Sequence, residues 1–352
     1  MKAQLRRWFR IFAVASLLGG SFASVFAGGL DQIRPISKLP EIDLLKLKQG
    51  DIVSARGPLG SFPRGLYAET CYFIHAAVPG AGEKLLHWNS AKHPGLEIST
   101  LREFRWPAPA DVWDALALNS SRREDRWLAE RTWQLRSVSD ARTDLHVSRI
   151  DIASFQEMTR RAPNNPSAQQ RDGVVNLFWR KLLRSRNDAL ASGGLGTVPS
   201  YSADGVEIAT RPEFNSLLRQ APAIAAHFRP LINGAPFTSN SDAAVEIVPY
   251  WQAAGARGHT NLHAAFFVGR KSTSSWQLAD CTYYVSDTYF MSFTLYELFP
   301  EDNGTLVWQI DFASAPFRSF TGGLDRLFAG GEMVKEAAKA AKLFRGDVEK
   351  NQ

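Results

Sequence analysis

The last third of the chain, from Leu262 to Phe344, has the residue pattern of four β-strands followed by one amphipathic helix. Aromatic and β-branched residues, which favour strands, fill four segments: Leu262–Gly269, Trp276–Val285, Tyr289–Phe299 and Thr305–Phe312. Asn303-Gly304 separates the last two segments and is a strong hairpin signal, because this pair tolerates positive φ. In the helical segment, apolar and small residues recur on one stripe and lysines lie opposite. An antiparallel sheet with a helix packed across it is therefore the expected core.

The segment Tyr289–Phe299 is apolar on both of its faces. Met291 and Phe293 belong to one face, whereas Phe290 and Tyr296 belong to the other. A sheet with water on one side alternates more cleanly between apolar and polar residues. We therefore expect both faces to be covered, one by the terminal helix and one by the middle of the chain or by a ligand.

The first 27 residues have the pattern of a secretory signal. Four basic residues precede the apolar run Ile11–Leu18, and Val25 and Ala27 fit the −3 and −1 positions of a cleavage site. The run is shorter than the roughly 20 apolar residues that a membrane span needs. We predict an exported protein, periplasmic or secreted, that is not an integral membrane protein after cleavage. An uncleaved membrane anchor is the alternative.

The positive charge of the chain is concentrated in that segment. The full sequence has 41 Lys and Arg against 35 Asp and Glu, a net charge of +6. Residues 1–27 hold four of these bases and no acid, which leaves 37 bases against 35 acids in the rest. The charge balance therefore gives no reason to expect a nucleic-acid partner.

The remainder of the chain divides into four parts by its patterns. The predicted parts are 28–105, an N-terminal strand and helix portion of the core; 106–242, a mainly helical insertion; 243–345, the meander with its helix; and 346–352, a tail. The clearest helical periodicity of the insertion lies around Phe178, Trp179, Leu182 and Leu183. We predict an α+β fold in which a curved antiparallel sheet grips a long C-terminal helix, with inserted helices in the middle of the chain.

One early segment resembles a known family. Glu69-Thr-Cys-Tyr-Phe-Ile-His-Ala-Ala-Val-Pro79, followed by Leu85-Leu-His-Trp88, is similar to the first strand and short helix pair of START-like domains, the helix-grip group that includes polyketide cyclases. The resemblance covers about residues 66–105 and 243–345, and the helical insertion departs from the family. It implies an apolar cavity between helix and sheet. The candidate cavity residues are Tyr284, Met291, Phe293, Trp308 and Val334.

A second resemblance is to an uncharacterised group of exported bacterial proteins. It rests on Tyr283-Tyr284-Val285-Ser286, Leu295-Tyr296 and Leu306-Val307-Trp308. This resemblance implies no activity.

Cys71 and His75 are the candidates for a catalytic dyad. Residues Leu47-Lys-Gln-Gly-Asp51 resemble the opening of NlpC/P60-type hydrolases, which need a thiolate beside a histidine base. The residues around Cys71 favour a strand, however, and four positions of a strand span about 13 Å. Ordinary strand positions are therefore the favoured interpretation.

Asp280 and Asp311 are carboxylates within otherwise apolar strands. If they face a cavity, burial raises their pKa values and suits them to act as acid or base. A position at an edge or toward water, satisfied by solvent or a partner, is the favoured alternative.

Metal binding and a disulfide are two further possibilities. His259 and His263 have HxxxH spacing, but Gly255 and Gly258 disfavour a helix there and no acidic residue lies between them. We therefore predict no metal and no cofactor. Cys71 and Cys281 could form one disulfide or remain two buried thiols on neighbouring strands.

These patterns support three functional hypotheses. The leading one is an exported protein that binds a hydrophobic or amphipathic small molecule, such as a lipid, in a helix-grip cavity. An exported hydrolase with a Cys/His or carboxylate site is the second, and a non-catalytic cell-envelope interaction protein is the third. Binding is favoured because no set of residues specifies a reaction.

Overall fold

An eight-stranded antiparallel sheet organises the computed structural model, which describes residues 28–138, 143–160, 163, 165–203, 205–238, 245–256, 258–317 and 322–350. The strand order is β1-β2-β10-β9-β8-β7-β6-β3. The strands are β1 (Ile52–Arg56), β2 (Gly65–Ile74), β3 (Ile98–Glu103), β6 (Val245–Ala256), β7 (His259–Lys271), β8 (Trp276–Val285), β9 (Met291–Glu301) and β10 (Gly304–Ser314). A separate two-stranded sheet pairs β4 (Tyr201–Ala203) with β5 (Val206–Ile208). The predicted signal segment, residues 1–27, lies outside the described residues.

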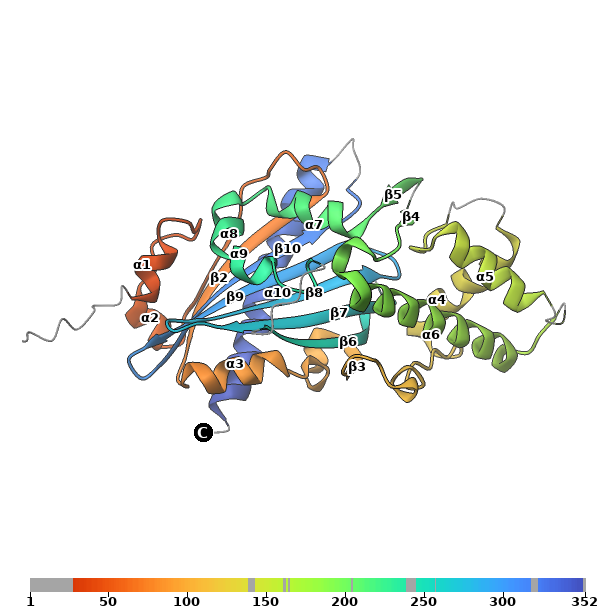
Figure 1. The fold of residues 1–352 in the computed structure, drawn as a ribbon, viewed down its shortest axis with the longest axis horizontal. Helices are drawn as coiled ribbons and strands as arrows, with labels where there is room; N and C mark the ends of the chain where they lie inside the picture. The colour runs from red at the N-terminus through yellow and green to blue at the C-terminus, as the bar shows by residue number, and fades with distance from the viewer. Residues whose placement is uncertain are drawn as a thin grey trace, which may run out of the picture.

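The helices occupy both sides of this sheet. They are α1 (Gly29–Ile33), α2 (Leu44–Lys48), α3 (Val78–Leu86), α4 (Arg123–Gln134), α5 (Arg149–Thr159), α6 (Ala168–Gly193), α7 (Thr210–Leu218), α8 (Pro222–His227), α9 (Arg229–Ile232) and α10 (Gly322–Glu349). Figure 1 shows α7, α8 and α9 in front of the sheet, whereas α10 passes behind it. Within the described ranges, no helix combines the length and hydrophobicity that crossing a membrane requires.

The predicted α+β class is confirmed, and so is a C-terminal helix packed on an antiparallel sheet. The four predicted meander strands correspond to β7, β8, β9 and β10. Two further strands flank them, one from a distant part of the sequence and one that directly precedes β7. β2 pairs with β10, with Cys71 opposite Trp308, and the unpredicted strand β6 pairs with β7.

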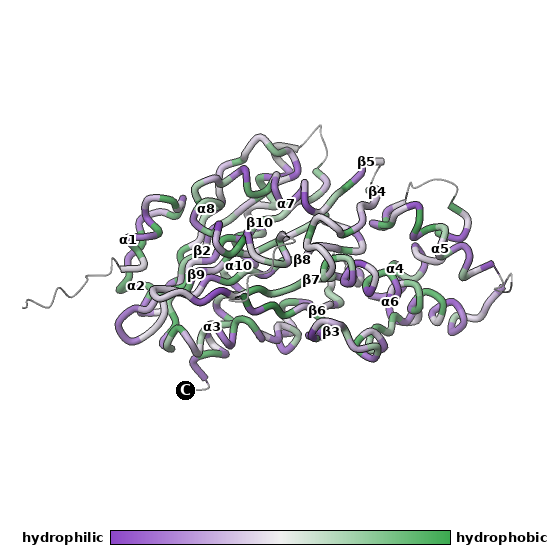
Figure 2. The backbone as a smooth tube through the Cα atoms, viewed as in Figure 1, coloured by the Kyte–Doolittle hydropathy of each residue, from purple (hydrophilic) through white to green (hydrophobic). Residues whose placement is uncertain are grey.

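The face toward the middle helices, hereafter the core face, forms the larger apolar core. Alternate residues of β9 point to it, including Met291, Phe293 and Leu295, and they pack with side chains of α6, α7 and α8. Helix α6 begins with a capping box between Ser167 and Gln170, which satisfies free backbone N–H groups of its first turn. Figure 2 shows stretches of hydrophobic residues along β6 and β7, which lie toward the β3 edge of the sheet.

The opposite face, hereafter the α10 face, carries a second apolar cluster at one end only. Leu85 of α3 and Phe344 of α10 are buried there together with Leu298 and Val307 of the sheet. Gly82 allows α3 to approach closely, because a Cβ at this position would lie 1.9 Å from the ring of Trp276. The expectation that both faces are covered is confirmed for this end of the sheet, and the other end of the α10 face is more polar.

Candidate functional site

A pocket of about 1080 Å³ lies at the polar end of the α10 face. It is bounded by the ends of β2 and β10, by the turn between β8 and β9, and by the start of α10. The lining residues are Leu66, Asp144, Ala256, Thr288, Tyr289, Ala313, Ala315, Pro316, Phe317, Asp325, Phe328 and Ala329. Phe328 is 74% exposed, so a large apolar side chain lies open to solvent at the rim.

A row of polar residues crosses the sheet next to this pocket. Thr294 of β9 lies opposite Asp280 of β8 on one side and opposite Asp311 of β10 on the other. Because neighbouring strands are about 4.8 Å apart, the Cα atoms of the two aspartates are roughly 10 Å apart. Ala313, which lines the pocket, lies two residues beyond Asp311 and on the same face. The row therefore borders the pocket.

Each aspartate accepts hydrogen bonds from neutral donors. Tyr250 Oη donates to Asp280 Oδ1 at 2.7 Å. Thr294 Oγ1 donates to Asp311 Oδ1 at 2.8 Å, and Gln309 Nε2 lies 3.1 and 3.0 Å from the two oxygens of the same carboxylate. Both aspartates are half-buried, as are Thr294 and the neighbouring Tyr296. We call Tyr250, Asp280, Thr294, Tyr296, Gln309 and Asp311 the polar strip.

The polar strip holds carboxylates that titrate near neutrality. Desolvation raises the pKa of Asp280 to about 7, the hydrogen bond from Tyr250 opposes this rise, and the charge of Asp311 adds to it. Desolvation likewise raises the pKa of Asp311 to about 6, against the hydrogen bonds from Thr294 and Gln309. Although each side chain keeps some solvent contact, surrounding protein removes enough water to disfavour the charged form. Both groups can therefore exchange protons at physiological pH.

His263 lies on the same face of the sheet, close to the pocket. Gln252 Nε2 donates to His263 Nδ1 at 2.8 Å, and Tyr289 Oη lies 3.5 Å from the same nitrogen. Because Nδ1 accepts a hydrogen bond, the ring proton is assigned to Nε2. The side chain is 5% exposed, and its Nε2 has no hydrogen-bond partner among the described residues. Burial lowers the pKa of His263 to about 4, which keeps the ring neutral.

The five candidate cavity residues do not surround one space. Tyr284, Met291, Phe293 and Trp308 are buried in the core of the core face, whereas Val334 belongs to α10 on the other side of the sheet. The first four contact protein side chains. The rings of Phe293 and Phe214 are 4.7 Å apart, and those of Trp308 and Phe228 are 5.9 Å apart.

The structure separates Cys71 from His75. Cys71 is fully buried on β2, and burial raises the pKa of its thiol. His75 is exposed just beyond the end of β2, where its Nε2 lies 3.0 Å from the carbonyl oxygen of Lys48. The strand between them spaces their Cα atoms about 13 Å apart. Neither residue is placed to activate the other.

Cys71 and Cys281 are free, buried thiols. They lie on β2 and β8, which are separated by β10 and β9 in the sheet. Three strand spacings of about 4.8 Å, together with an offset of four residues along the strands, place their Cα atoms roughly 19 Å apart, well beyond the reach of a disulfide. The disulfide alternative is therefore wrong, and the two thiols are not on neighbouring strands.

His259 and His263 both lie on β7, a strand, as the nearby glycines predict. His259 Nε2 lies 2.7 Å from Asp287 Oδ2, and its ring stacks on Trp127 at 3.9 Å. His263 instead binds Gln252. Over the described part of the chain, no group of three or more His, Cys, Asp or Glu side chains is arranged to hold a metal ion.

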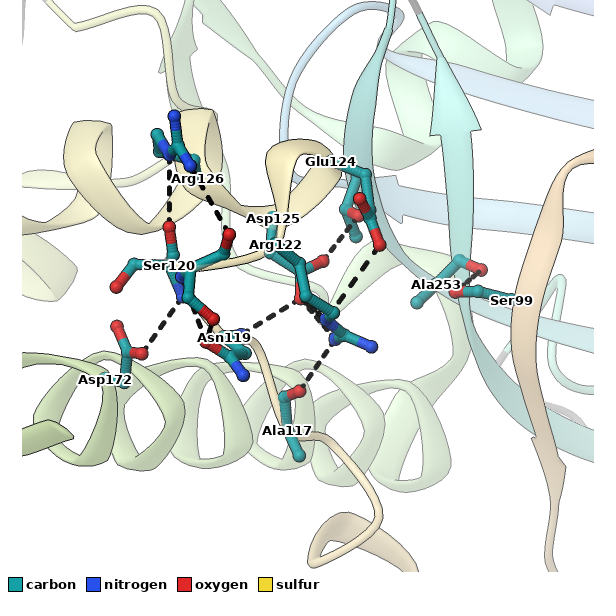
Figure 3. Close-up of polar contacts among 12 residues, drawn as sticks. Ser99, Ala117, Asn119, Ser120, Arg122, Glu124, Asp125, Arg126, Asp172 and Ala253 are labelled. Carbon is teal, nitrogen blue, oxygen red and sulfur yellow. Dashed lines mark hydrogen bonds and ion pairs between the residues drawn. The ribbon is translucent and has the colours of Figure 1, made fainter. Parts of the chain in front are cut away.

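A second pocket, of about 590 Å³, lies between the loop before α4 and the helix α6. Figure 3 shows the polar contacts of this loop. The carboxylate of Asp125 accepts from the backbone N–H of Asn119 at 2.9 Å and from Thr260 Oγ1 at 2.7 Å, and it pairs with Arg122. Asp172 accepts from the backbone N–H of Ser120 at 3.0 Å. These contacts fasten the loop to α6 and β7, which is a structural role.

Sequence reasoning identified Asp280 and Asp311 as candidates but missed Tyr250, Thr294 and the donor role of His263. Ser292, Thr294 and Tyr296 alternate with Met291, Phe293 and Leu295 along β9, so the polar side of this strand was visible in the sequence. The strand pairing that aligns Thr294 with both aspartates was not visible.

Comparisons with protein-family models, with curated proteins and with solved structures found no match for this chain. The pocket and the polar strip beside it are the features of the described structure that bear on function.

Proposed function

We propose that the protein binds a small amphipathic molecule on the α10 face, with its apolar part in the pocket and its polar part against the polar strip. The observation that carries this proposal is the position of Asp311, two residues from the pocket residue Ala313 on the same face of β10. Export from the cell is part of the proposal and rests on the sequence of residues 1–27 alone.

The pocket has the size and lining that such a ligand needs. Small-molecule sites are commonly about 300–1,000 Å³, and they combine apolar walls with a few polar groups that fix orientation. Here the apolar walls include Leu66, Pro316, Phe317 and Phe328. Burial of apolar surface contributes about 25 cal/mol per Å² before the costs of association. The hydroxyl, amide and carboxyl groups of the polar strip would fix the orientation of the bound molecule.

A tryptophan placed in the pocket tests the proposal. Ala313→Trp is expected to fill the space between β10 and α10 and to abolish binding of N-phenyl-1-naphthylamine, an apolar dye whose fluorescence rises when it leaves water. Ala55→Trp is the matched control, because Ala55 is also a half-buried alanine but lies on the edge strand β1 and faces the other side of the sheet. Equal dye binding by both variants and the original protein would refute the pocket as the ligand site.

A carboxylate-dependent enzyme that uses the same pocket is the second candidate. It is favoured by Asp280, whose pKa of about 7 suits proton transfer at physiological pH. Mass spectrometry of co-purifying molecules separates the two functions. An enzyme in which Asp280→Asn blocks turnover should retain a molecule of different mass from the one retained by the original protein. A binding protein should retain the same molecule in a smaller amount.

A further inference from the structure

A third pocket, of about 420 Å³, lies at the end of the sheet that carries the β9–β10 hairpin. Gly28 and Gly29 line it from the start of α1, and Glu301 and Asp302 line it from the hairpin. None of its described lining residues is Lys, Arg or His. The pocket wall therefore carries negative charge that no basic residue of the wall balances.

Packing fixes the position of the chain directly after Gly28. A Cβ atom at Gly29 would lie 2.6 Å from the Cβ of Phe299, so glycine is needed for the backbone to approach β9 this closely. Leu30 and Ile33 follow on α1 and are buried in the core of the core face. Gly28 itself is exposed. The chain thus changes from exposed to buried between two consecutive glycines.

The carboxylate of Glu301 lies close to the backbone of both glycines. The N–H of Gly29 donates to Glu301 Oε1 at 3.1 Å. A Cβ atom built on Gly28 would lie 3.7 Å from the same oxygen. By covalent geometry the nitrogen of Gly28 is about 2.5 Å from that position, and therefore within about 6 Å of Glu301 Oε1. An ionised carboxylate accepts several hydrogen bonds at once, so Glu301 can accept from a second donor here.

The sequence indicates a source for that second donor. Val25 and Ala27 match the −3 and −1 positions of a signal cleavage site, which places the cleaved peptide bond between Ala27 and Gly28. Hydrolysis of this bond consumes one water molecule, leaves a carboxylate on Ala27 and frees the amine of Gly28, which takes up a proton at neutral pH. The cleavage pattern and the packing of α1 are independent observations, and both point to Gly28.

We propose that the Ala27–Gly28 bond is a processing site and that Glu301 binds the α-ammonium group that processing creates on Gly28. This assignment rests on the export part of the proposed function and does not depend on the ligand of the pocket at the α10 face. In the unprocessed chain the same nitrogen is a neutral amide with a single N–H, so the charge pair forms only after cleavage. Processing thereby fastens the new end of the chain to the β9–β10 hairpin.

Export of the full sequence from a bacterial host tests the processing site. Intact-mass measurement and N-terminal sequencing of the exported protein should show a chain that begins with Gly28. Ala27→Phe should block this cleavage, because the −1 position requires a small residue. An original protein that is not exported, or an exported one that begins at any other residue, would overturn the processing site.

Amine labelling tests the role of Glu301 in the processed chain. A carboxylate beside the ammonium should raise the pKa of the α-amine above its ordinary range, which leaves less of the reactive neutral form at neutral pH. Trace acetylation with acetic anhydride, followed by mass spectrometry of the N-terminal peptide, should label Gly28 about threefold or more slowly in the original protein than in Glu301→Gln. The difference should shrink at high salt, because Glu301 is only half-buried and salt screens such a pair.

Two comparisons distinguish this contact from a general effect of charge. Asp302→Asn removes one negative charge from the same pocket but keeps Glu301, so it should change the labelling rate much less. A chain that begins with Ala27 has its α-amine about 3.5 Å farther along the chain, and its labelling should not respond to Glu301→Gln. Equal labelling of Gly28 in the original protein and in Glu301→Gln would overturn the role of Glu301 and leave the processing site in place. Dye binding at the α10 face should be unchanged in Glu301→Gln, so Ala313→Trp tests the ligand proposal separately.

Discussion

Asp280 of β8 and Asp311 of β10 lie in one row of the sheet, separated by the single residue Thr294 of β9. The two carboxylates come from positions 31 residues apart in the sequence, and the meander brings them to the same face because each hairpin reverses the chain. The pKa of Asp280 is raised to about 7 and that of Asp311 to about 6. Ionisation of these two carboxyls should therefore affect the stability of the fold as well as ligand binding.

The stability of the protein should fall as Asp280 ionises. In the unfolded chain this carboxyl titrates near pH 4, whereas in the folded chain its pKa is about 7. Between these values the folded state binds more protons, so the free energy of unfolding decreases as the pH rises. Asp280→Asn should thus be about 1 to 3 kcal/mol more stable than the original protein at pH 8 and nearly equal to it at pH 4, after allowance for the solvent contact of this half-buried group. Urea unfolding at the two pH values measures this.

Asp302→Asn is the control for that experiment, since Asp302 is exposed. Its stability should follow that of the original protein at both pH values. A stability gain from Asp280→Asn that is the same at pH 4 and pH 8 would contradict the titration argument.

The hydroxyl of Tyr250 should lower the pKa of Asp280, against the rise that desolvation causes. Its hydrogen bond to Asp280 Oδ1, 2.7 Å long, stabilises the charged form. Tyr250→Phe removes this bond and should raise the pKa of Asp280 further above neutrality. NMR titration of the carboxyl carbons reports the change directly. Tyr296→Phe serves as the comparison, because no hydrogen bond joins Tyr296 to Asp280 within the described structure, and it should leave the titration midpoint nearly unchanged.

Two phenylalanines of α10 should differ sharply in their effect on stability. Phe344 is 1% exposed and packs against Trp88 with ring centroids 5.5 Å apart, whereas Phe328 is 74% exposed. Phe344→Ala should lower the free energy of unfolding by about 3 to 5 kcal/mol, because it leaves a cavity under the helix. Phe328→Ala should change it by less than about 0.5 kcal/mol and weaken dye binding at the pocket rim. Chemical unfolding followed by tryptophan fluorescence checks both, and similar losses from the two variants would contradict the packing described for α10.

Both thiols should be unreactive in the folded protein. Cys71 and Cys281 are fully buried, and burial raises the pKa of each. Ellman's reagent should therefore react with neither under native conditions and with two thiols per chain in guanidinium chloride without reductant. Rapid labelling of one thiol in the native protein would contradict this burial and support the hypothesis of a reactive Cys71. The absence of labelling after unfolding would indicate a disulfide.

The sequence was sufficient for the class of fold but not for the site. The alternation of β9 and the Asn303-Gly304 hairpin signal depend on local backbone chemistry, so the meander and its helix could be predicted. The neighbours of β10 depend on pairing with β2, more than 200 residues earlier in the chain. Local patterns contain no information on that pairing, and for the same reason they did not show which face of the meander meets α10.

The candidate cavity residues illustrate this limit. Met291 and Phe293 are apolar residues of a strand predicted to line a cavity, yet they are packed in the core of the core face. The half-buried side of the same strand carries Ser292, Thr294 and Tyr296. The most hydrophobic residues of β9 lie on the core face, which excludes water. The pocket borders the α10 face, where side chains remain partly exposed to solvent.

The position of Thr294 between two aspartates also bears on how reliably the sheet assembles. Successive side chains of a strand point to opposite faces, so a one-residue slip of β9 would exchange every residue between them. Such a slip would place Phe293 or Leu295 between the two carboxylates and would bury Thr294 in the hydrocarbon interior. A misaligned β9 would thus lose the hydrogen bond to Asp311 on one face and close packing on the other. The polar strip therefore disfavours slipped registers of β9 and helps the sheet to form in a single register.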